Sequence, residues 1–299
     1  MTPFPSLHPR RPFTLAWEDR RLELGARTCV MGIVNITPDS FSDGGRFFGT
    51  TAAIDQGLAL ADAGADVLDI GGESTRPFAD PVEANEEIQR VIPVIRALAS
   101  QLSIPISIDT TKAAVAEQAL AAGASIVNDV SAFRMDPEMP AMVAQAGVPV
   151  IVMHMLGSPR TMQVDPVYED VVSEIRQFLA ETIARAVDSG IQKKAIIADP
   201  GIGFGKTVDH NLTLIGRFNE FADLGVPLLI GPSRKAFIRN LLKAPSQKDI
   251  PPDSVEVEIG TQAAVAAAVM NGAHIVRVHN VANTRQTAAI IDALHRVGT

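Results

Sequence analysis

Eight short apolar runs recur along the chain, and segments with helical spacing separate them. The runs occupy residues 30–34, 65–70, 104–108, 124–128, 148–153, 195–198, 226–230 and 273–278. Several of the intervening segments, such as 52–64 and 172–190, end in glycine, which commonly closes a helix before the next strand. Regular alternation of strand and helix favours a parallel sheet. Eight such units predict an α/β fold, a closed (β/α)8 TIM barrel.

One domain accounts for nearly the whole sequence. The chain has 299 residues, near the ~250 that are typical of this barrel, and no linker-like change in composition divides it. Two short runs at 13–17 and 21–25 flank Glu18–Asp19 and predict an N-terminal β-hairpin. We therefore expect a flexible lead-in at 1–12, a single domain at 13–299 and a surface loop at 243–256. An open, doubly wound sheet is the alternative fold.

Composition limits the classes of function. Hydrophobic residues make up 46% and charged residues 20%, which indicates a globular core rather than disorder. A net charge of −8 argues against bulk nucleic-acid binding, so an anionic ligand would need a local basic cluster. The single cysteine, Cys29, excludes an internal disulfide and suits a reducing compartment. No apolar run reaches the ~20 residues that span a bilayer, and we expect no secretory signal in the N-terminal segment. We expect a cytoplasmic protein that binds neither nucleic acid nor membrane.

Polar side chains occur at the ends of all eight apolar runs. These residues are Asn35, Asp69, Asp109, Asn128 with Asp129, His154, Asp199, Ser233 to Lys235, and Arg277 with His279. In a (β/α)8 barrel the carboxyl ends of the strands face one mouth, where active sites lie. A single polar residue in such a place more often caps a helix. Polar groups at every strand end predict an assembled site.

The predicted site has an accepting half and a cationic half. Asp109, Asn128 and Asp199 offer hydrogen-bond acceptors and one amide, which suit a flat, nitrogen-rich heterocycle. The cationic half suits an anion such as phosphate, and its members are Arg76, Arg234, Lys235, Arg277 and His279. Asn35 can offer a hard oxygen to Mg²⁺, which also takes phosphate oxygens from a substrate. Together these groups suggest displacement of a phosphate-type leaving group.

The stretch DPGIGFGKT at 199–207 resembles a P-loop only superficially. The P-loop pattern needs glycine at position 200, where this chain has Pro200. The stretch also lacks the G-x-G-x-x-G spacing of a dinucleotide site. Nucleotide hydrolysis is therefore not predicted.

Seven motifs in a fixed order carry a family resemblance. They are NITPDSFSDGG, DIGGESTRP, IDT, VND, DPGIGFGKT, GPSRK and RVH. From about Thr28 to its end, the chain resembles the dihydropteroate synthases of folate biosynthesis. The resemblance implies a (β/α)8 barrel and a homodimer that uses Mg²⁺. It also implies a transferase that joins 6-hydroxymethyl-7,8-dihydropterin pyrophosphate to p-aminobenzoate. Pyrophosphate would depart first, and the arylamine would then attack.

The resemblance also implies a role for each matching position. The pterin would be bound by Asp109, Asn128, Met153, Asp199, Phe204, Lys235 and Arg277. Pyrophosphate would be bound by Asn35, Thr75, Arg277 and His279, with Mg²⁺ on Asn35. p-Aminobenzoate, or a sulfonamide that mimics it, would be bound by Phe41, Thr75, Arg76, Pro77 and Ser233. The catalytic residues would be Asp109, Lys235 and Asn35. The segments 31–45 and 71–77 would be mobile loops that close over pyrophosphate.

Two positions depart from the usual pattern of this family. Phe78 stands where glycine is usual, and Asn280 stands where aspartate is usual. Two alternative functions remain at this point. A pterin-binding methyltransferase that passes a methyl group from a folate to a corrinoid protein would share the barrel, although it has no need for the Ser233–Lys235 anion site. A catalytically inactive pterin-binding homologue is the other alternative.

Overall fold

The computed structural model of the chain describes residues 7–36, 45–74, 79–158 and 160–298. The strands in these ranges are β1 (Phe13–Trp17), β2 (Arg20–Leu24), β3 (Cys29–Asn35), β4 (Val67–Gly71), β5 (Ile106–Asp109), β6 (Ile126–Asp129), β7 (Val150–Met153), β8 (Ile196–Asp199), β9 (Leu229–Ile230) and β10 (Ile275–Val278). The α-helices are α1 (Gly45–Asp62), α2 (Ala84–Ala99), α3 (Ala113–Ala121), α4 (Met139–Ala146), α5 (Val171–Asp188), α6 (Val208–Gly216), α7 (Ala236–Leu242), α8 (Val255–Met270) and α9 (Val281–Gly298). Two 3₁₀ helices, η2 (Lys193–Ala195) and η3 (Phe218–Leu224), precede β8 and β9.

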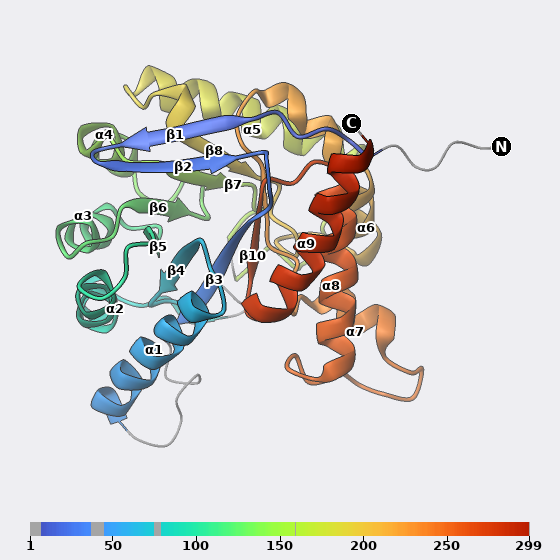
Figure 1. Cartoon of the computed structure of the whole chain (residues 1–299), viewed down its shortest axis with the longest axis horizontal. Helices are drawn as coiled ribbons and strands as arrows, with labels where there is room; N and C mark the ends of the chain where they lie inside the picture. The colour runs from blue at the N-terminus through green and yellow to red at the C-terminus, as the bar shows by residue number, and fades with distance from the viewer. Residues whose placement is uncertain (1–6, 37–44, 75–78, 159, 299) are drawn as a thin grey trace.

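Eight parallel strands close into a barrel, which confirms the predicted fold. Neighbouring strands follow the order β8-β7-β6-β5-β4-β3-β10-β9. The first and last strands of this order also meet, because Ala198 pairs with Leu228 and the Ala198 amide donates to the Pro227 carbonyl at 3.0 Å. Closure rules out the open-sheet alternative. The helices lie around the outside of the barrel (Figure 1).

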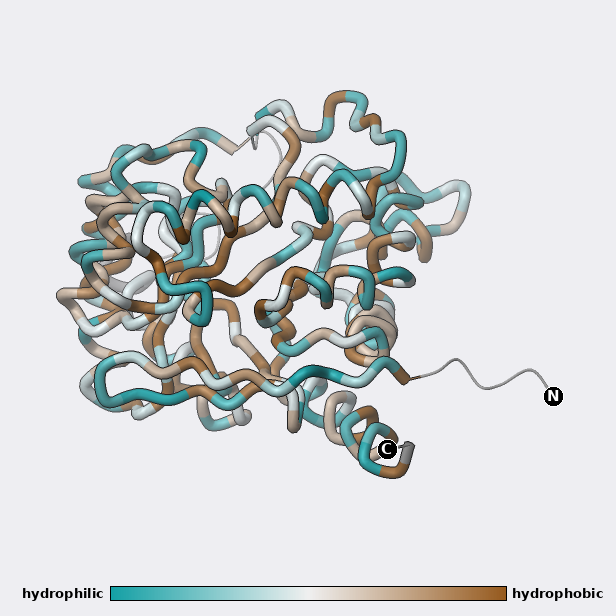
Figure 2. The backbone as a smooth tube through the Cα atoms, turned by 90° about the horizontal axis from the view of Figure 1, so that it is seen from above, coloured by the Kyte–Doolittle hydropathy of each residue, from teal (hydrophilic) through white to brown (hydrophobic). Residues whose placement is uncertain are grey.

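The barrel strands are buried on both faces. Every residue of β4, β5, β6, β7 and β8 is buried, as expected for parallel strands covered by helices. Hydrophobic residues accordingly run along the central strands, while hydrophilic residues recur along the outer helices (Figure 2). Polar groups inside such strands must find partners, because an unpaired polar group is costly in a dry interior. The polar residues of these strands therefore mark the part of the barrel where a functional site is expected.

The N-terminal hairpin covers the amino ends of the strands, as a separate two-stranded sheet. β1 and β2 pair antiparallel with Phe13 opposite Leu24, which confirms the predicted hairpin. The Phe13 ring packs edge-on against His274, the residue directly before β10, with 5.3 Å between ring centroids. In the preceding segment, Arg10 forms an ion pair with Asp292 of α9 at 2.6 Å. The carboxyl ends of the strands, at the opposite end of the barrel, are left uncovered by the hairpin.

Two helices, α7 and α8, follow β9, and residues 243–254 connect them as the predicted surface loop. The C-terminal helix α9 then packs beside α8 and β3 (Figure 1). Within the described ranges, no helix is both long enough and apolar enough to cross a lipid bilayer.

Candidate active site

The strand register brings the accepting residues of the predicted site together. Asp109 ends β5 and pairs with Gly71 on one side and Asn128 on the other. Asp199 ends β8 and pairs with Met153, which ends β7. Because these strands are consecutive neighbours in the barrel, the end residues line one continuous arc at its carboxyl end.

A buried ion-pair network spans this end of the barrel. Arg277 of β10 donates through Nε to Asp69 Oδ2 and through Nη2 to Asp109 Oδ2, the latter at 2.7 Å. Asn128 Nδ2 donates to the same oxygen of Asp69 at 3.0 Å. With its amide nitrogen held in this way, Asn128 presents its Oδ1 as an acceptor. β10 and β5 lie three steps apart in the strand order, so these side chains meet inside the barrel rather than along the sheet.

Asp69, which the sequence predicted at the barrel mouth without a binding role, is the centre of this network. It is fully buried, and its Oδ1 has no hydrogen-bond partner among the described residues. A sequence signal was present, because a carboxylate inside an otherwise apolar strand has to be paired or hydrogen-bonded. Its partner Arg277 lies 208 positions away, beyond the reach of any local pattern.

The second carboxylate of the site, Asp199, opens a glycine-rich turn. Asp199 Oδ1 accepts from the Gly201 amide at 2.7 Å. The turn then places the Phe204 ring below Lys235, whose Nζ lies 3.9 Å from the ring centroid. Gly203 has φ 84°, and a Cβ at this position would lie 2.9 Å from Lys235 Cδ, so the turn requires glycine there.

Apolar side chains form the remaining wall of the site. Met153 and Phe204, both predicted pocket residues, belong to one buried cluster with Val130, Met155 and Met162. A flat ligand here would have carboxylates at its edges and apolar or aromatic contacts on its faces. This combination is what a nitrogen heterocycle requires.

Burial dominates the electrostatics of the two carboxylates. It raises the pKa of Asp109 to about 7, against the opposing effect of Arg277 and with a further upward contribution from Asp69. Burial also raises the pKa of Asp199 to about 6, although the Gly201 amide and Lys235 favour its ionised form. For Arg277, burial would lower the pKa, but Asp69 and Asp109 outweigh it and raise the pKa. Both carboxylates are therefore poised to change ionisation near neutral pH, as functional-site groups often are.

A second group of polar residues lies at the ends of β9 and β10. Ser233 Oγ accepts from the His279 amide at 3.2 Å and lies 2.9 Å from His279 Nδ1. Arg234 adopts a left-handed conformation with φ 60°, and its amide donates to Thr261 Oγ1 at 3.2 Å. These bonds fix the β9–α7 connection against the end of β10 and against α8. The structure thus brings together His279, a member of the predicted cationic half, and Ser233, which the resemblance assigns to p-aminobenzoate.

Asn35 ends β3 and pairs in register with Gly71, next to Asp109. Its side chain has no hydrogen-bond partner among the described residues. The described part of the chain also holds no group of three or more His, Cys, Asp or Glu side chains that could bind a metal ion. Any metal at Asn35 would therefore need most of its ligands from water or substrate.

Asn280 has a structural task. The Asn283 amide donates to Asn280 Oδ1 at 3.1 Å, and α9 begins at Val281. Asn280 is thus the N-cap of α9, a position where asparagine and aspartate are about equally good. The exchange of aspartate for asparagine leaves the helix start intact. Phe41, Thr75, Arg76, Pro77 and Phe78 lie outside the described residues.

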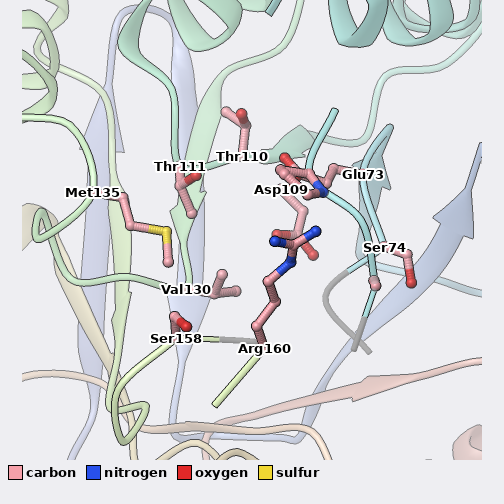
Figure 3. Close-up of a pocket in the computed structure, with 11 residues that line it drawn as sticks. Glu73, Ser74, Asp109, Thr110, Thr111, Val130, Met135, Ser158 and Arg160 are labelled. Atoms are coloured by element: carbon pink, nitrogen blue, oxygen red, sulfur yellow. The ribbon is translucent and has the colours of Figure 1, made fainter. Parts of the chain in front are cut away.

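A cavity of about 190 Å³ adjoins Asp109 (Figure 3). Its labelled walls include Thr110 and Thr111 after β5, Val130 and Met135 after β6, and Ser158 and Arg160 after β7. Glu73 and Ser74, which follow β4, form the opposite side. Asp109, one of the three accepting residues, therefore borders open space at the carboxyl end of the barrel.

Comparison with known proteins places this site in a family. Residues 31–279 match the pterin binding enzyme family. The chain is 48% identical over 272 residues to a dihydropteroate synthase of Synechocystis, covering 91% of this chain and 92% of that relative. A Yersinia pestis dihydropteroate synthase, solved as a complex with a sulfonamide drug, superposes with a TM-score of 0.88 at 40% identity, covering 95% and 100% of the two chains. The Xanthomonas albilineans enzyme, solved with 7,8-dihydropteroate, superposes with a TM-score of 0.80 at 42% identity, covering 91% and 95%.

Proposed function

Because the chain belongs to the pterin-binding enzyme family, and within it to the dihydropteroate synthases, we propose that it joins 6-hydroxymethyl-7,8-dihydropterin pyrophosphate to p-aminobenzoate. The products are 7,8-dihydropteroate and pyrophosphate, and the protein is a transferase of folate biosynthesis. The observation that carries this proposal is the buried acceptor set of Asp109, Asn128 and Asp199 around an apolar wall. A pterin ring has several N–H donors along its edges and two apolar faces, which that set matches.

Each pocket residue has a place in pterin binding. The carboxylates of Asp109 and Asp199 and the Oδ1 of Asn128 accept from the amino group and ring N–H groups of the pterin. Lys235 donates to a pterin acceptor, and its position over Phe204 keeps it at the rim of the same pocket. Met153 and Phe204 contact the ring, and Arg277 covers its face. An analogue that lacks these N–H groups would leave buried acceptors unpaired, which gives the site its selectivity.

The reaction exchanges one bond at the pterin methylene. The C–O bond to pyrophosphate breaks, and its electron pair leaves with the pyrophosphate. Positive charge develops on the methylene and spreads into the electron-rich pterin, where the Asp109 carboxylate stabilises it. The arylamine nitrogen then forms the new C–N bond and loses a proton. Asp109 has to be ionised for this role, so catalysis should weaken as Asp109 takes up a proton.

Asn35 fits a magnesium site that is completed by the substrate. Mg²⁺ keeps several waters and commonly takes only one or two oxygens from the protein, together with phosphate oxygens. The Asn35 side chain, which has no partner among the described residues, can supply one such oxygen. When bound, Mg²⁺ would offset the negative charge of the departing pyrophosphate. Thr75, Arg277 and His279 are the proposed pyrophosphate contacts.

The p-aminobenzoate site is proposed from the family resemblance together with Ser233. Ser233 is buried and held by His279, so its hydroxyl has a fixed position at the barrel mouth. Phe41, Thr75, Arg76 and Pro77 complete the proposed set. The Yersinia pestis relative was solved with a sulfonamide drug. We propose that sulfonamides compete with p-aminobenzoate here as well.

We also propose a homodimer in the cytoplasm. Exposed apolar side chains gather on α7 and α8, where Leu241, Leu242, Val255 and Ile259 are 46% to 72% exposed. Burying such a patch in a second copy would remove it from water. Sedimentation analysis should give a dimer, and Ile259→Glu should shift the population toward the monomer. A monomeric wild-type protein would contradict this assembly.

The experiment that tests the function is an assay of pyrophosphate release. Release should require both the pterin pyrophosphate and p-aminobenzoate, and chelation of Mg²⁺ should abolish it. Asp109→Asn should lose most of the activity while remaining folded. Absence of release by folded wild-type protein would favour the inactive homologue, and methyl transfer from a folate to a corrinoid protein would favour the methyltransferase.

A further inference from the structure

Lys206 is a buried lysine to which the proposed function gives no task. It lies directly after the Gly201–Gly205 turn and before α6, and only 4% of the residue is exposed. A buried ammonium is costly unless it is paired or hydrogen-bonded. Among the described residues, no carboxylate lies within ion-pair distance of Lys206. A methionine of similar length would fill the same space without a charge, so packing alone does not account for a lysine here.

The hydrogen bonds of Lys206 tie the turn to the end of β7. Its Nζ donates to the Phe204 carbonyl at 2.8 Å and to His154 Nδ1 at 3.1 Å. The turn is already pressed against His154, because a Cβ at Gly201 would lie 1.9 Å from the His154 carbonyl oxygen. The His154 amide in turn donates to the Asp199 carbonyl at 3.0 Å. Lys206 therefore links Phe204 to His154, and His154 is in turn bonded to Asp199. Both Asp199 and Phe204 are proposed to bind the pterin.

His154 is built to accept from Lys206. Its imidazole packs edge-on against Phe178, with 4.9 Å between ring centroids, and lies near Tyr168. Burial lowers the pKa of His154 to about 2, with Lys206 and Arg134 acting in the same direction, so the ring is neutral. The Tyr168 hydroxyl donates to the Gly205 carbonyl at 2.9 Å and fixes the far end of the turn. The Lys206 ammonium is thus held by neutral acceptors rather than by a direct ion pair.

We propose that Lys206 is a positioning residue for the pterin pocket, where it locks the Gly201–Gly205 turn to His154 and thereby fixes Asp199 and the Phe204 ring. The inference rests on the proposed function, since it assigns the turn to pterin binding. The two hydrogen bonds of Lys206 restrain both ends of the turn. Gly201 donates to Asp199 Oδ1, and Phe204 faces Lys235. A loosened turn would move an acceptor and a ring contact together.

The charge of Lys206 has a second effect, on the ionisation of Asp199. Burial raises the pKa of Asp199, whereas the cations around it, Lys235, Lys206 and Arg277, favour its ionised form. Burial lowers the pKa of Lys206 to about 7, and the charged groups that act on it are Asp199, Lys235 and Arg134. Removing the ammonium should therefore require a higher pH to ionise Asp199.

Two substitutions separate the two effects. Lys206→Met removes both the donor and the charge, whereas Lys206→Gln removes the charge but can still donate to the Phe204 carbonyl. Lys194→Met is the matched control, because Lys194 is exposed on η2, which precedes β8, whereas the turn follows the opposite end of that strand. Binding of 6-hydroxymethylpterin is measured by calorimetry, and the pH dependence of kcat/KM is measured by pyrophosphate release.

Lys206→Met should weaken pterin binding on the order of 10- to 100-fold, as expected for loss of charge-assisted hydrogen bonds. The KM for p-aminobenzoate at saturating pterin should stay the same. Lys206→Gln should keep more of the pterin affinity, and both variants should move the acid limb of kcat/KM to higher pH. Lys194→Met should match the wild type in every readout.

Circular dichroism and thermal unfolding establish whether each variant is folded. A folded Lys206→Met protein with pterin affinity within twofold of wild type and an unmoved acid limb would overturn the proposal. If neither Lys206 variant folds, Lys206 is a structural residue and the proposal is also overturned. Failure of the proposed function looks different, because wild-type protein would then release no pyrophosphate even though pterin binding could still respond to Lys206.

Discussion

Replacing Asp69 by asparagine tests whether the buried ion-pair network sets up the pterin pocket. Asp69 Oδ2 accepts from both Arg277 Nε and Asn128 Nδ2. The substitution keeps the size of the side chain but removes its charge. It also places an NH₂ group where Asp69 Oδ1 now has no hydrogen-bond partner among the described residues. We expect lower stability and weaker pterin binding from the same change.

The magnitude follows from two contributions. A hydrogen bond to a charged group contributes about 1.5–3 kcal/mol, and part of this is lost when the acceptor becomes neutral. A buried donor without an acceptor costs about 1–3 kcal/mol more. Arg277 keeps its pair with Asp109, so its charge is not left fully uncompensated. Together these effects predict a decrease of roughly 2–4 kcal/mol in the free energy of unfolding.

Pterin binding should weaken because Asn128 loses its orientation. With aspartate at position 69, Asn128 Nδ2 donates to Asp69 Oδ2, which leaves Asn128 Oδ1 to accept from the pterin. With asparagine at position 69, the Asn128 amide can turn over and present its donor side to a pterin donor. A mismatch of this kind costs about 1.5–3 kcal/mol, or roughly 10- to 150-fold in affinity.

Urea denaturation and calorimetry with a pterin ligand measure the two effects. Asp66→Asn is the matched control. Asp66 directly precedes β4, at the opposite end of the barrel from the site. Like Asp69, it is an aspartate held by an ion pair, in its case with Arg27 and Arg285. The control should lose stability and keep its pterin affinity. If Asp69→Asn loses stability but binds pterin as wild type does, the network is structural and the orientation of Asn128 does not depend on it.

Three further predictions concern the ligands. Asp199→Asn should weaken pterin binding at least tenfold, roughly 1.4 kcal/mol or more. The reason is that a carboxylate that accepts from Gly201 and from the pterin becomes an amide that cannot accept from both. Calorimetry of the pterin pyrophosphate measures this affinity. Only the ionised carboxylates of Asp109 and Asp199 accept from the pterin, so the affinity for pterin should be highest above neutral pH. It should fall as the pH drops through about 7, the pKa of Asp109, and then through about 6, the pKa of Asp199. A pterin affinity that does not change with pH would refute this. p-Aminobenzoate should bind weakly to the ligand-free protein and tightly once pterin, pyrophosphate and Mg²⁺ are present, as linkage requires, whereas equal affinities would contradict a shared site.

The barrel could be predicted because it is encoded locally. Each apolar run is long enough for one buried strand, and each glycine-terminated segment is long enough for one helix. Closure was predicted from the number of units alone, because strands of open and closed parallel sheets are both buried on two faces and read alike in the sequence. In the structure, closure depends on the contact of β8 with residues that precede β9, through Ala198 and Leu228. The number of units favoured the barrel over the open sheet, and the pairing of Ala198 with Leu228 shows in the structure that the barrel is closed.

The binding roles of Asp109 and Asp199 could be predicted from the sequence, whereas the place of Asp69 at the centre of the network could not. Asp109 and Asp199 are the last residues of their strands, whereas Asp69 lies two residues before the end of β4. Side chains two apart share one face of a strand, so Asp69 shares its face with Gly71, which pairs with Asp109. His154 shows the converse. It follows the last residue of β7, but it packs against Phe178 of α5 rather than joining the acceptor set.

Arg277 shows how the two halves of the site can share one residue. The resemblance assigns it both to the pterin and to pyrophosphate, while the structure pairs it with Asp69 and Asp109. A guanidinium has five N–H donors, and these two bonds use only the Nε hydrogen and one Nη2 hydrogen. Its inner edge is therefore fixed by carboxylates while its outer edge keeps donors for an anion. Because both carboxylates are buried, they hold the Arg277 guanidinium in one place. If Arg277 contacts pyrophosphate as proposed, this fixed cation would already be oriented when negative charge develops on the leaving group. The network that orients Asn128 thus also holds the cation that we propose contacts the leaving group.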